Sequence, residues 1–365
     1  MGKRKTIKTY KEKFNPLVFP QDEQKHDHII EWWYFNGNLK TKSGEDFFFM
    51  NCLFSAKTKK INIPLIKNFP FKNIFFSHYL LSGEKASYSK INPLCLVDKN
   101  NFQKPLLWIN YDNGCLIKET KPFEYNIAND FIDLKLKSKK PPLLVNKKGF
   151  IDLGIKTTYY YSLTRLETTG LIKVDNKWIE VTGLSWMDHQ WAQTPLTSDD
   201  EWIWFSLQLS DGTDILCFNY GNEIKTSHAS IINKKGEIFS TNKVSIAPLG
   251  TEYTSKITNT KYELEYQIDI PEYEIFIKTS PVKKTQEMIF GTINYWEGGI
   301  AIKGKKQNKK ISGMGFMELL PKVQKKKILK AVVQELKKNS FMGNIKEMAD
   351  ISTKAILALN EELKK

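Results

Sequence analysis

The sequence predicts a mainly β protein made of two related antiparallel β-barrels packed together, followed by a C-terminal helical tail. The chain has 365 residues, which is more than one small hydrophobic core usually supports. It contains 22 Phe, 15 Tyr and 9 Trp, and these residue types favour strands and large buried surfaces. Two aromatic motifs also occur twice in the same order, which indicates two copies of one unit.

The expected strands begin with a hairpin, because two aromatic-rich runs at 29–40 and 46–56 are joined by a short Lys-Ser-Gly-Glu turn. A second pair of strand-like runs, at 157–167 and 178–187, lies on either side of an Asp-Asn turn. No convincing helix interrupts this pattern. Further strand-like runs occupy about 201–220, 228–240, 262–278 and 287–303.

The last segment of the chain has a different pattern. Residues 322–338 and 344–364 place Ile, Leu, Val and Ala at helical spacing between lysines, which predicts two amphipathic helices. One interpretation is a helical lid that packs on a barrel, and the other is contact with a membrane surface.

The internal repeat has two parts. The motif at 31–35 matches 201–205 at an offset of 170 residues, and the motif at 181–188 matches 311–318 at an offset of 130. Antiparallel strands in units of this size remove their exposed edges by closing into a barrel, and about eight strands leave room for a small ligand. We therefore predict four segments: a basic arm at 1–19, lipocalin-like domains at 20–195 and 196–320, and the helical tail at 321–365.

The net charge of +15 lies mainly at the two ends of the chain. Residues 1–13 carry six Lys or Arg and one Glu, and residues 321–365 carry eleven Lys and five acidic residues. These basic ends predict peripheral contact with an anionic membrane. Nucleic acid is not an expected partner, because the chain has only two arginines and the guanidinium fork is the group that reads guanine.

The predicted location is the cytoplasm. No apolar run approaches the roughly 20 residues that a membrane-spanning helix needs. The basic N-terminus lacks the apolar stretch of a secretory signal. The four cysteines are scattered without a Cys-x-x-Cys pair, which fits reduced thiols.

Three groups of residues carry a family resemblance: Glu-Trp-Trp-Tyr-Phe-Asn-Gly at 31–37, Trp-Met-Asp-His-Gln-Trp at 186–191, and Tyr-Trp-Glu-Gly at 295–298 with the motif at 313–318. Together they resemble the double-lipocalin family of AttH proteins and carotenoid 1,2-hydratases, from about residue 20 to 320. The resemblance implies two calycin-type barrels. It also implies a reaction class, because the family includes hydratases of carotenoid end groups, and fungal cyclases of similar architecture fold apolar polyenes. Many members have no defined reaction, and fold alone does not fix function.

The motif at 188–191 concentrates an acid, an imidazole and an indole at the expected junction between the halves, where pockets are common. Adding water to an alkene requires a proton donor of raised pKa and aromatic faces that tolerate a cation. We therefore expect Asp188 to be the acid and His189 to orient it or to position water. The expected substrate-binding residues are Glu31, Trp32, Trp33, Tyr34, Arg165, Trp186, Trp191, Trp202 and Trp296.

The alternative interpretation of these residues is structural. Asp188 and His189 would then satisfy buried backbone groups, and the tryptophans would fill the core. The match to the hydratases is also incomplete: their His-x-Trp pair, matched by His189 and Trp191, is followed by a Tyr-x-Asp that supplies the acid, and this chain has none there. Asp211 and Asp214 lie nearby in sequence, but in a turn where we expect them to be solvated.

Several charged residues remain open to two interpretations. Arg165, the only arginine of the folded body, either pairs with a buried carboxylate such as Glu31 or lies at the surface. Glu31 is either a second carboxylate of the pocket or the exposed first residue of a strand. Structural roles are favoured for Glu297 and Glu318, because only the first copy of the repeat ends in Asp-His-Gln-Trp.

No metal or cofactor is expected. His26 and His28 alternate along the chain close to Glu31, as ligands on one face of a strand would, but no third ligand is identifiable. Gly-rich nucleotide motifs are absent from the sequence. The expected function is acid-catalysed hydration or cyclisation of an isoprenoid or polyene-like molecule in an aromatic pocket, by a hydro-lyase or a cyclase. The alternatives are a carrier or sensor that binds such a molecule unchanged, and a scaffold that docks on membranes.

Overall fold

The computed structural model describes residues 12–58, 72–84, 86–95, 106–111, 116–153, 156–193, 201–221, 226–290 and 293–321. Within these ranges the chain is almost entirely antiparallel β-structure, which confirms the predicted mainly β class. Among these residues no helix has the length and apolarity to cross a membrane. The predicted tail helices lie outside the described residues. Short 3-10 helices are η1 (Gln21–Glu23), η4 (Val145–Lys147) and η5 (Pro271–Tyr273).

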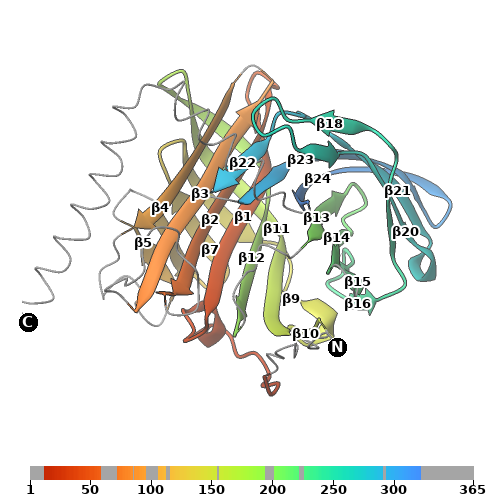
Figure 1. The fold of residues 1–365 in the computed structure, drawn as a ribbon, viewed down its shortest axis with the longest axis horizontal. Coiled ribbons are helices and arrows are strands. Elements are labelled where there is room, and N and C mark those ends of the chain that lie inside the picture. Colours follow the sequence, from red (N-terminus) through yellow and green to blue (C-terminus); the bar gives the residue numbers. More distant parts are fainter. Residues whose placement is uncertain are drawn as a thin grey trace, which may run out of the picture.

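The first sheet contains strands β1 to β12 in the order β4-β3-β2-β1-β12-β11-β8-β7-β6-β5, and β9 and β10 pair with β11. It forms the curled sheet at the left of Figure 1, in red to yellow-green. Its strands are β1 (Ile30–Thr41), β2 (Asp46–Lys57), β3 (Asn73–Gly83), β4 (Ser87–Cys95), β5 (Trp108–Asn110), β6 (Leu116–Lys121), β7 (Glu124–Ala128), β8 (Ile132–Ser138), β9 (Leu143–Leu144), β10 (Phe150–Asp152), β11 (Thr157–Val174) and β12 (Lys177–Ala192).

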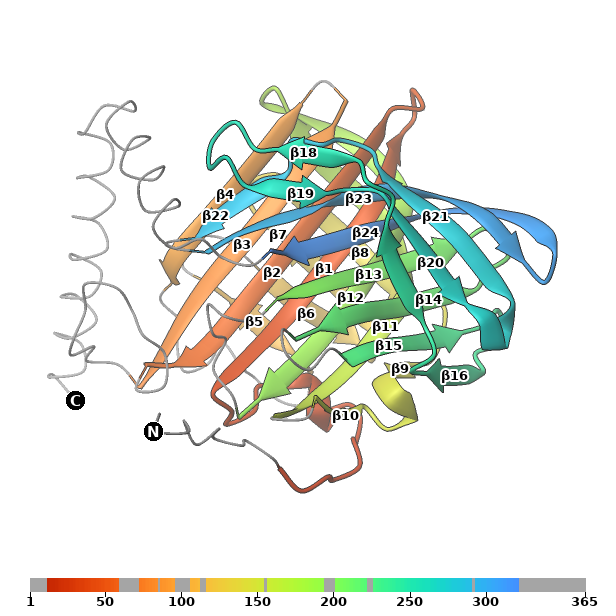
Figure 2. The ribbon, with the colours of Figure 1, turned by 45° about the vertical axis from the view of Figure 1, so that its right-hand side comes forward.

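The second sheet has the order β16-β15-β14-β13-β24-β23-β21-β20-β17, and β22 pairs with β23. It curls against the first sheet, as the green to blue strands show in Figure 2, while β18 and β19 form a separate two-stranded sheet. Its strands, with these two, are β13 (Trp202–Leu209), β14 (Asp214–Tyr220), β15 (Thr226–Ile232), β16 (Ile238–Thr241), β17 (Ser245–Pro248), β18 (Glu252–Thr254), β19 (Lys261–Glu263), β20 (Tyr266–Ile270), β21 (Ile275–Pro281), β22 (Glu287–Phe290), β23 (Ile293–Lys306) and β24 (Lys309–Leu320).

The internal repeat is reproduced in the register of the two sheets. In the first sheet β1 pairs with β12 so that Tyr34 lies opposite Asp188, and in the second β13 pairs with β24 so that Trp204 lies opposite Glu318. These positions are related by the offsets of 170 and 130 found in the sequence. The repeated motifs therefore form the central strand pair of each sheet. The domain boundaries themselves stay a prediction.

The predicted hairpins are also present. The runs at 29–40 and 46–56 form β1 and β2, and those at 157–167 and 178–187 form most of β11 and β12. The turn between β11 and β12 places Asp175 and Asn176 at φ of 48° and 63°. Positive φ at both central residues matches the twist of an antiparallel hairpin, and Asp and Asn tolerate it well.

Each sheet encloses its own apolar core, and a third core lies between the sheets. The alternation of side chains along a strand divides them: Trp33 and Phe35 of β1 point into the first sheet, whereas Tyr34 points towards the second. The two sheets approach each other closely in this third core. A Cβ added at Gly299 of β23 would lie 2.0 Å from a ring carbon of Phe48 of β2, so only glycine fits there. We call the apolar core that lies between the two sheets the interface core.

A buried ion cluster also joins the two sheets. Arg165 of β11 donates from Nη2 to Asp214 Oδ1 at 2.6 Å, and Lys140 donates to Asp214 Oδ2 at 2.7 Å. Arg165 therefore pairs with a buried carboxylate, as one of the two interpretations predicts, but the carboxylate is Asp214 and not Glu31. The predicted solvation of Asp214 is wrong, since this residue is fully buried at the start of β14. Arg165 and Lys140 compensate the negative charge of the Asp214 carboxylate. A carboxylate in a solvated turn would not need such partners.

Candidate active site

Asp188 and His189 are consecutive in β12, and their side chains lie on opposite faces of the first sheet. Asp188 points into the interface core, where it contacts Tyr160 and Trp186. His189 points into the first sheet, where it contacts Glu31 and lies over Trp33. Strand geometry imposes this separation, because successive side chains alternate between faces. The predicted catalytic pair therefore belongs to two separate clusters.

Asp188 is buried and held by three hydrogen bonds. The hydroxyl groups of Ser162 and Tyr160 and the indole Nε1 of Trp186 each donate to its carboxylate at 2.6 Å. Tyr160 Oη in turn accepts a bond of 2.8 Å from Nε1 of Trp204 in the second sheet. Burial raises the pKa of Asp188 to about 7, although the three donors oppose this effect by stabilising the charged form.

Two further acids of the interface core come from the second sheet. Glu297 of β23 lies opposite Glu318 of β24, and their carboxyl groups share one face. Tyr34 Oη donates to Glu297 Oε1 at 2.5 Å, and Trp202 Nε1 donates to Glu318 Oε1. Burial and the neighbouring Glu318 raise the pKa of Glu297 well above its ordinary value.

The pKa of Glu318 is raised to about 7, first by burial and then by the charge of Asp188, while the bond from Trp202 opposes the rise. Asp188, Glu297 and Glu318 thus form a set of acids that disfavour each other's charge, which we call the acid cluster. A carboxyl group kept neutral near pH 7 is the form that donates a proton.

Aromatic rings surround the acid cluster and reach one edge of the interface core. Tyr34 and Trp204 meet edge to face, with ring centroids 5.5 Å apart. At the edge, Trp32, Trp202 and Glu318 are only partly buried. Aromatic faces stabilise cations, so a positive charge that develops beside Glu318 has suitable neighbours.

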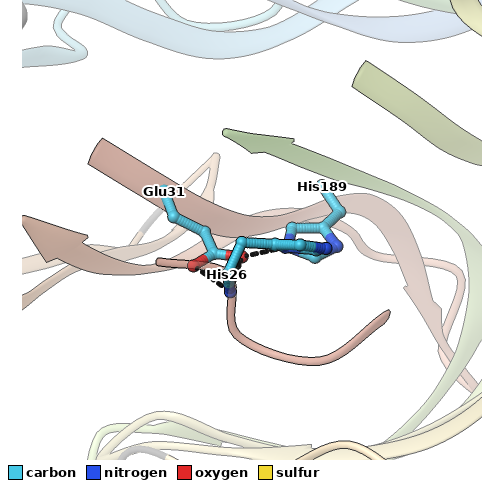
Figure 3. Close-up of side chains that lie close together, drawn as sticks. All are labelled: His26, Glu31 and His189. Carbon is cyan, nitrogen blue, oxygen red and sulfur yellow. Dashed lines mark hydrogen bonds and ion pairs between the residues drawn. The ribbon is translucent and has the colours of Figure 1, made fainter. Parts of the chain in front are cut away.

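The second cluster lies inside the first sheet, beside Trp33 and Trp191, and Figure 3 shows its side chains. Glu31 Oε1 lies 2.9 Å from His189 Nε2 and 2.8 Å from His26 Nδ1. The donor atoms of these three side chains all lie within 4.8 Å of one another. Within the part of the chain that the structure describes, these three residues form a group that could hold a metal ion. The third ligand missing from the sequence analysis is His189, whereas His28 bonds Glu12 instead, at 2.9 Å.

The two imidazoles and the carboxyl group of this second cluster have shifted pKa values. Burial lowers the pKa of His189 to about 4, although Glu31 opposes it. Burial alone would lower the pKa of His26, but its bonds with Asp22 and Glu31 outweigh that and raise it. For Glu31 the bonds from His189 and His26 outweigh burial, so its pKa is lowered. Glu31 is therefore a carboxylate. Because it is buried, it is not the exposed first residue of a strand.

The predicted substrate-binding residues do not gather in one pocket. Inside the first sheet lie Glu31, Trp33 and Trp191; in the interface core and at its edge lie Trp32, Tyr34, Trp186 and Trp202; inside the second sheet lies Trp296; and Arg165 belongs to the ion cluster with Asp214. The interface core also contains residues that the sequence analysis left out or classed as structural: Tyr160, Trp204, Tyr295, Glu297 and Glu318. The sequence itself points to Glu318, because the repeat offset of 130 aligns this residue with Asp188.

Two curled antiparallel sheets with the same central register, packed around buried acids, define an internally duplicated β protein of the lipocalin-like class. The profile of the AttH-like family matches residues 10–321, so the chain belongs to the AttH-like family, as its motifs predict. No curated protein sequence matches it.

Two solved structures share the fold. The crystal structure of an AttH protein from Nitrosomonas europaea has a TM-score of 0.71 and 24% identity, with 85% of this chain and 98% of that chain covered. Kievitone hydratase from Nectria haematococca has a TM-score of 0.67 and 15% identity, with 87% and 96% covered. At these identities the likeness is one of fold.

Proposed function

We propose that this protein adds water to a C=C bond of a lipophilic, isoprenoid or polyene-like molecule, with Glu318 as the proton donor. The observation that carries the proposal is the pairing of Glu297 with Glu318, because Glu318 is a residue at the edge of the interface core with a pKa of about 7. Such an acid is half protonated near neutral pH, where general acids work best. The shared fold of kievitone hydratase, a hydratase by name, supports the reaction class.

Glu318 suits the role of donor better than Asp188 does. Both oxygens of Asp188 already accept bonds, and the residue is 3% exposed. A proton on Asp188 therefore has no open direction towards a substrate. Glu318 accepts its bond from Trp202 on Oε1 and keeps part of its surface exposed at the edge of the interface core. Asp188 acts through Glu318, because its charge raises the pKa of that residue.

The reaction proceeds in two steps. The carboxyl group of Glu318 gives its proton to one alkene carbon, and the positive charge that forms on the other carbon faces the rings of Trp202 and Trp204. Water then attacks that carbon and loses a proton to the Glu318 carboxylate, so that one water is added and the acid is restored. Glu297 stays neutral through its raised pKa and its bond from Tyr34, and it limits the repulsion that ionised Glu318 meets.

The test uses candidate substrates and product masses. Kievitone, geraniol and farnesol are incubated with the full chain in heavy-oxygen water, and the products are analysed by mass spectrometry. Hydration adds one heavy-oxygen water, cyclisation leaves the mass unchanged, and a carrier returns the molecule unaltered. We expect Glu318→Gln to reduce turnover at least about a hundredfold. Asp188→Asn reduces it less, and the exposed control Glu180→Gln keeps it.

A second measurement needs no substrate. A protonated carboxyl group gives an infrared C=O band that disappears when the group ionises. We expect Glu318→Gln to remove one component of this band at pH 6, whereas Glu180→Gln leaves the spectrum unchanged. Undiminished turnover in Glu318→Gln, or an unchanged carboxyl band, would show that Glu318 is not the acid.

A further inference from the structure

The cluster inside the first sheet brings two imidazoles and one carboxylate together. Two imidazole nitrogens, His26 Nδ1 and His189 Nε2, converge on one oxygen of Glu31 at 2.8 and 2.9 Å (Figure 3). His189 is fully buried, Glu31 is 1% exposed, and His26 covers them from the segment before β1. Neutral imidazole and carboxylate are the groups that hold zinc and related ions.

The nitrogen of each imidazole that points away from Glu31 also faces an oxygen. His26 Nε2 lies 3.1 Å from Asp22 Oδ1, and His189 Nδ1 lies 3.3 Å from Tyr161 Oη. Metal-ligating histidines are typically held in this way, because a bond at the second nitrogen fixes the tautomer and the ring orientation. Asp22 is itself held by a bond of 2.5 Å from the backbone nitrogen of Val18.

Aromatic contacts hold both imidazole rings in place. His26 stacks on Trp191, with centroids 3.8 Å apart and planes 9° apart, and His189 stacks on Trp33, with centroids 4.9 Å apart. The rings therefore present their nitrogens to Glu31 with little freedom to rotate. A preorganised donor set of this kind loses little entropy when an ion binds.

We propose that His26, Glu31 and His189 bind one divalent first-row transition metal ion, of which Zn²⁺ is the test case. Tetrahedral bonds of about 2.1 Å place ligand atoms about 3.4 Å apart, so the ion enters when Glu31 Oε1 moves roughly half an ångström farther from each of the two nitrogens. The proton on each of these two nitrogens leaves to solvent or moves to the second nitrogen of the same ring, which faces Asp22 or Tyr161. Three protein ligands leave one position for water or a small anion.

The ion ties the segment before β1 to the end of β12, on the face of β12 opposite Asp188. The site is therefore independent of the acid cluster, and the two proposals fail separately. His28 provides a matched control, because it lies two residues from His26 but bonds Glu12 rather than Glu31. His26 is only 17% exposed but lies outside the strands, so its replacement leaves the sheet pairing intact.

The experiment is a calorimetric titration of the chelator-treated full chain with Zn²⁺, combined with the visible absorption spectrum of the Co²⁺ form. We expect one ion per chain, a Co²⁺ spectrum typical of four-coordinate nitrogen and oxygen ligation, and unchanged binding in His28→Ala. Affinity falls at least tenfold in His26→Ala and in Glu31→Gln, and less in Asp22→Asn. Circular dichroism checks that each variant is folded.

The absence of Zn²⁺ binding by the wild-type chain overturns the proposal, whatever the variants do. Equal affinity in His26→Ala and wild type also overturns it, as does an equal loss of affinity in His28→Ala. If His26→Ala does not fold, Asp22→Asn and the Co²⁺ spectrum of the wild type decide the question. A six-coordinate spectrum without nitrogen ligands counts against the site.

Discussion

Glu297 and Glu318 are register partners on adjacent antiparallel strands, and their carboxyl groups lie on the face of the second sheet that meets the first. Like charges directly opposite each other destabilise a sheet. Burial adds to this effect, so both groups have raised pKa values, to about 7 for Glu318. The pair therefore couples the stability of the protein to pH.

The first prediction concerns stability between pH 5 and pH 8. A Glu side chain in the unfolded chain ionises near its ordinary pKa of 4.5, whereas folded Glu318 keeps its proton until about pH 7. Between these values the folded protein holds a proton that the unfolded chain has released, so the free energy of unfolding falls as pH rises. We expect Glu318→Gln to remove about 1–3 kcal/mol of this fall, measured by urea unfolding at both pH values. An unaltered pH dependence in that variant, with Glu180→Gln as control, contradicts the assignment.

The second prediction concerns the ion cluster at Asp214. Asp214→Ala leaves Arg165 and Lys140 without their shared partner in a buried site, so we expect a loss of about 3–5 kcal/mol in the free energy of unfolding. Asp211→Ala is the control, because Asp211 pairs with Lys306 while its side chain is 36% exposed, and we expect a loss below about 1 kcal/mol. Similar losses in the two variants would mean that the buried cations find other partners.

The third prediction concerns the close contact between Gly299 and Phe48. Gly299→Ala places a methyl group inside the ring of Phe48, which is itself only 3% exposed. We expect a loss of about 1–3 kcal/mol. Combined with Phe48→Leu, the same change costs less than it does alone, because the two residues share one contact. Additive losses in thermal unfolding would locate the strain elsewhere.

The fourth prediction concerns the indole that bonds Glu318. Trp202→Phe keeps an aromatic ring but removes the Nε1 donor that lowers the pKa of Glu318. The pH at which the infrared carboxyl band disappears should therefore move upward. Trp178→Phe is the control, since Trp178 is 48% exposed at the β11–β12 hairpin. A downward shift would show that Trp202 acts mainly by excluding water.

The central strands of both sheets could be predicted because their sequences repeat. Aromatic runs gave the hairpins, and the offsets of 170 and 130 aligned Tyr34 with Trp204 and Asp188 with Glu318, as the register confirms. The pairing of Arg165 with Asp214 could not be predicted. It depends on how one sheet is placed against the other, and no local pattern encodes that placement.

Strand periodicity alone is enough to separate Asp188 from His189. The two residues lie within β12, near its end, where alternation sends neighbours to opposite faces. The expected strand at 178–187 ends just before them, and alternation does not apply at a junction between domains. Glu297 gave no comparable signal, because its role depends on the bond from Tyr34, 263 residues away in sequence.

The pairing of β1 with β12 also imposes an order on folding. β1 ends at Thr41 and β12 begins at Lys177, so the central pair of the first sheet forms only after the first half of the chain has left the ribosome. Until then one edge of β1 lacks its partner, and open strand edges recruit other chains. Contacts between such distant segments also form slowly. The nascent protein therefore passes through a stage in which the open edge of β1 can pair with other chains.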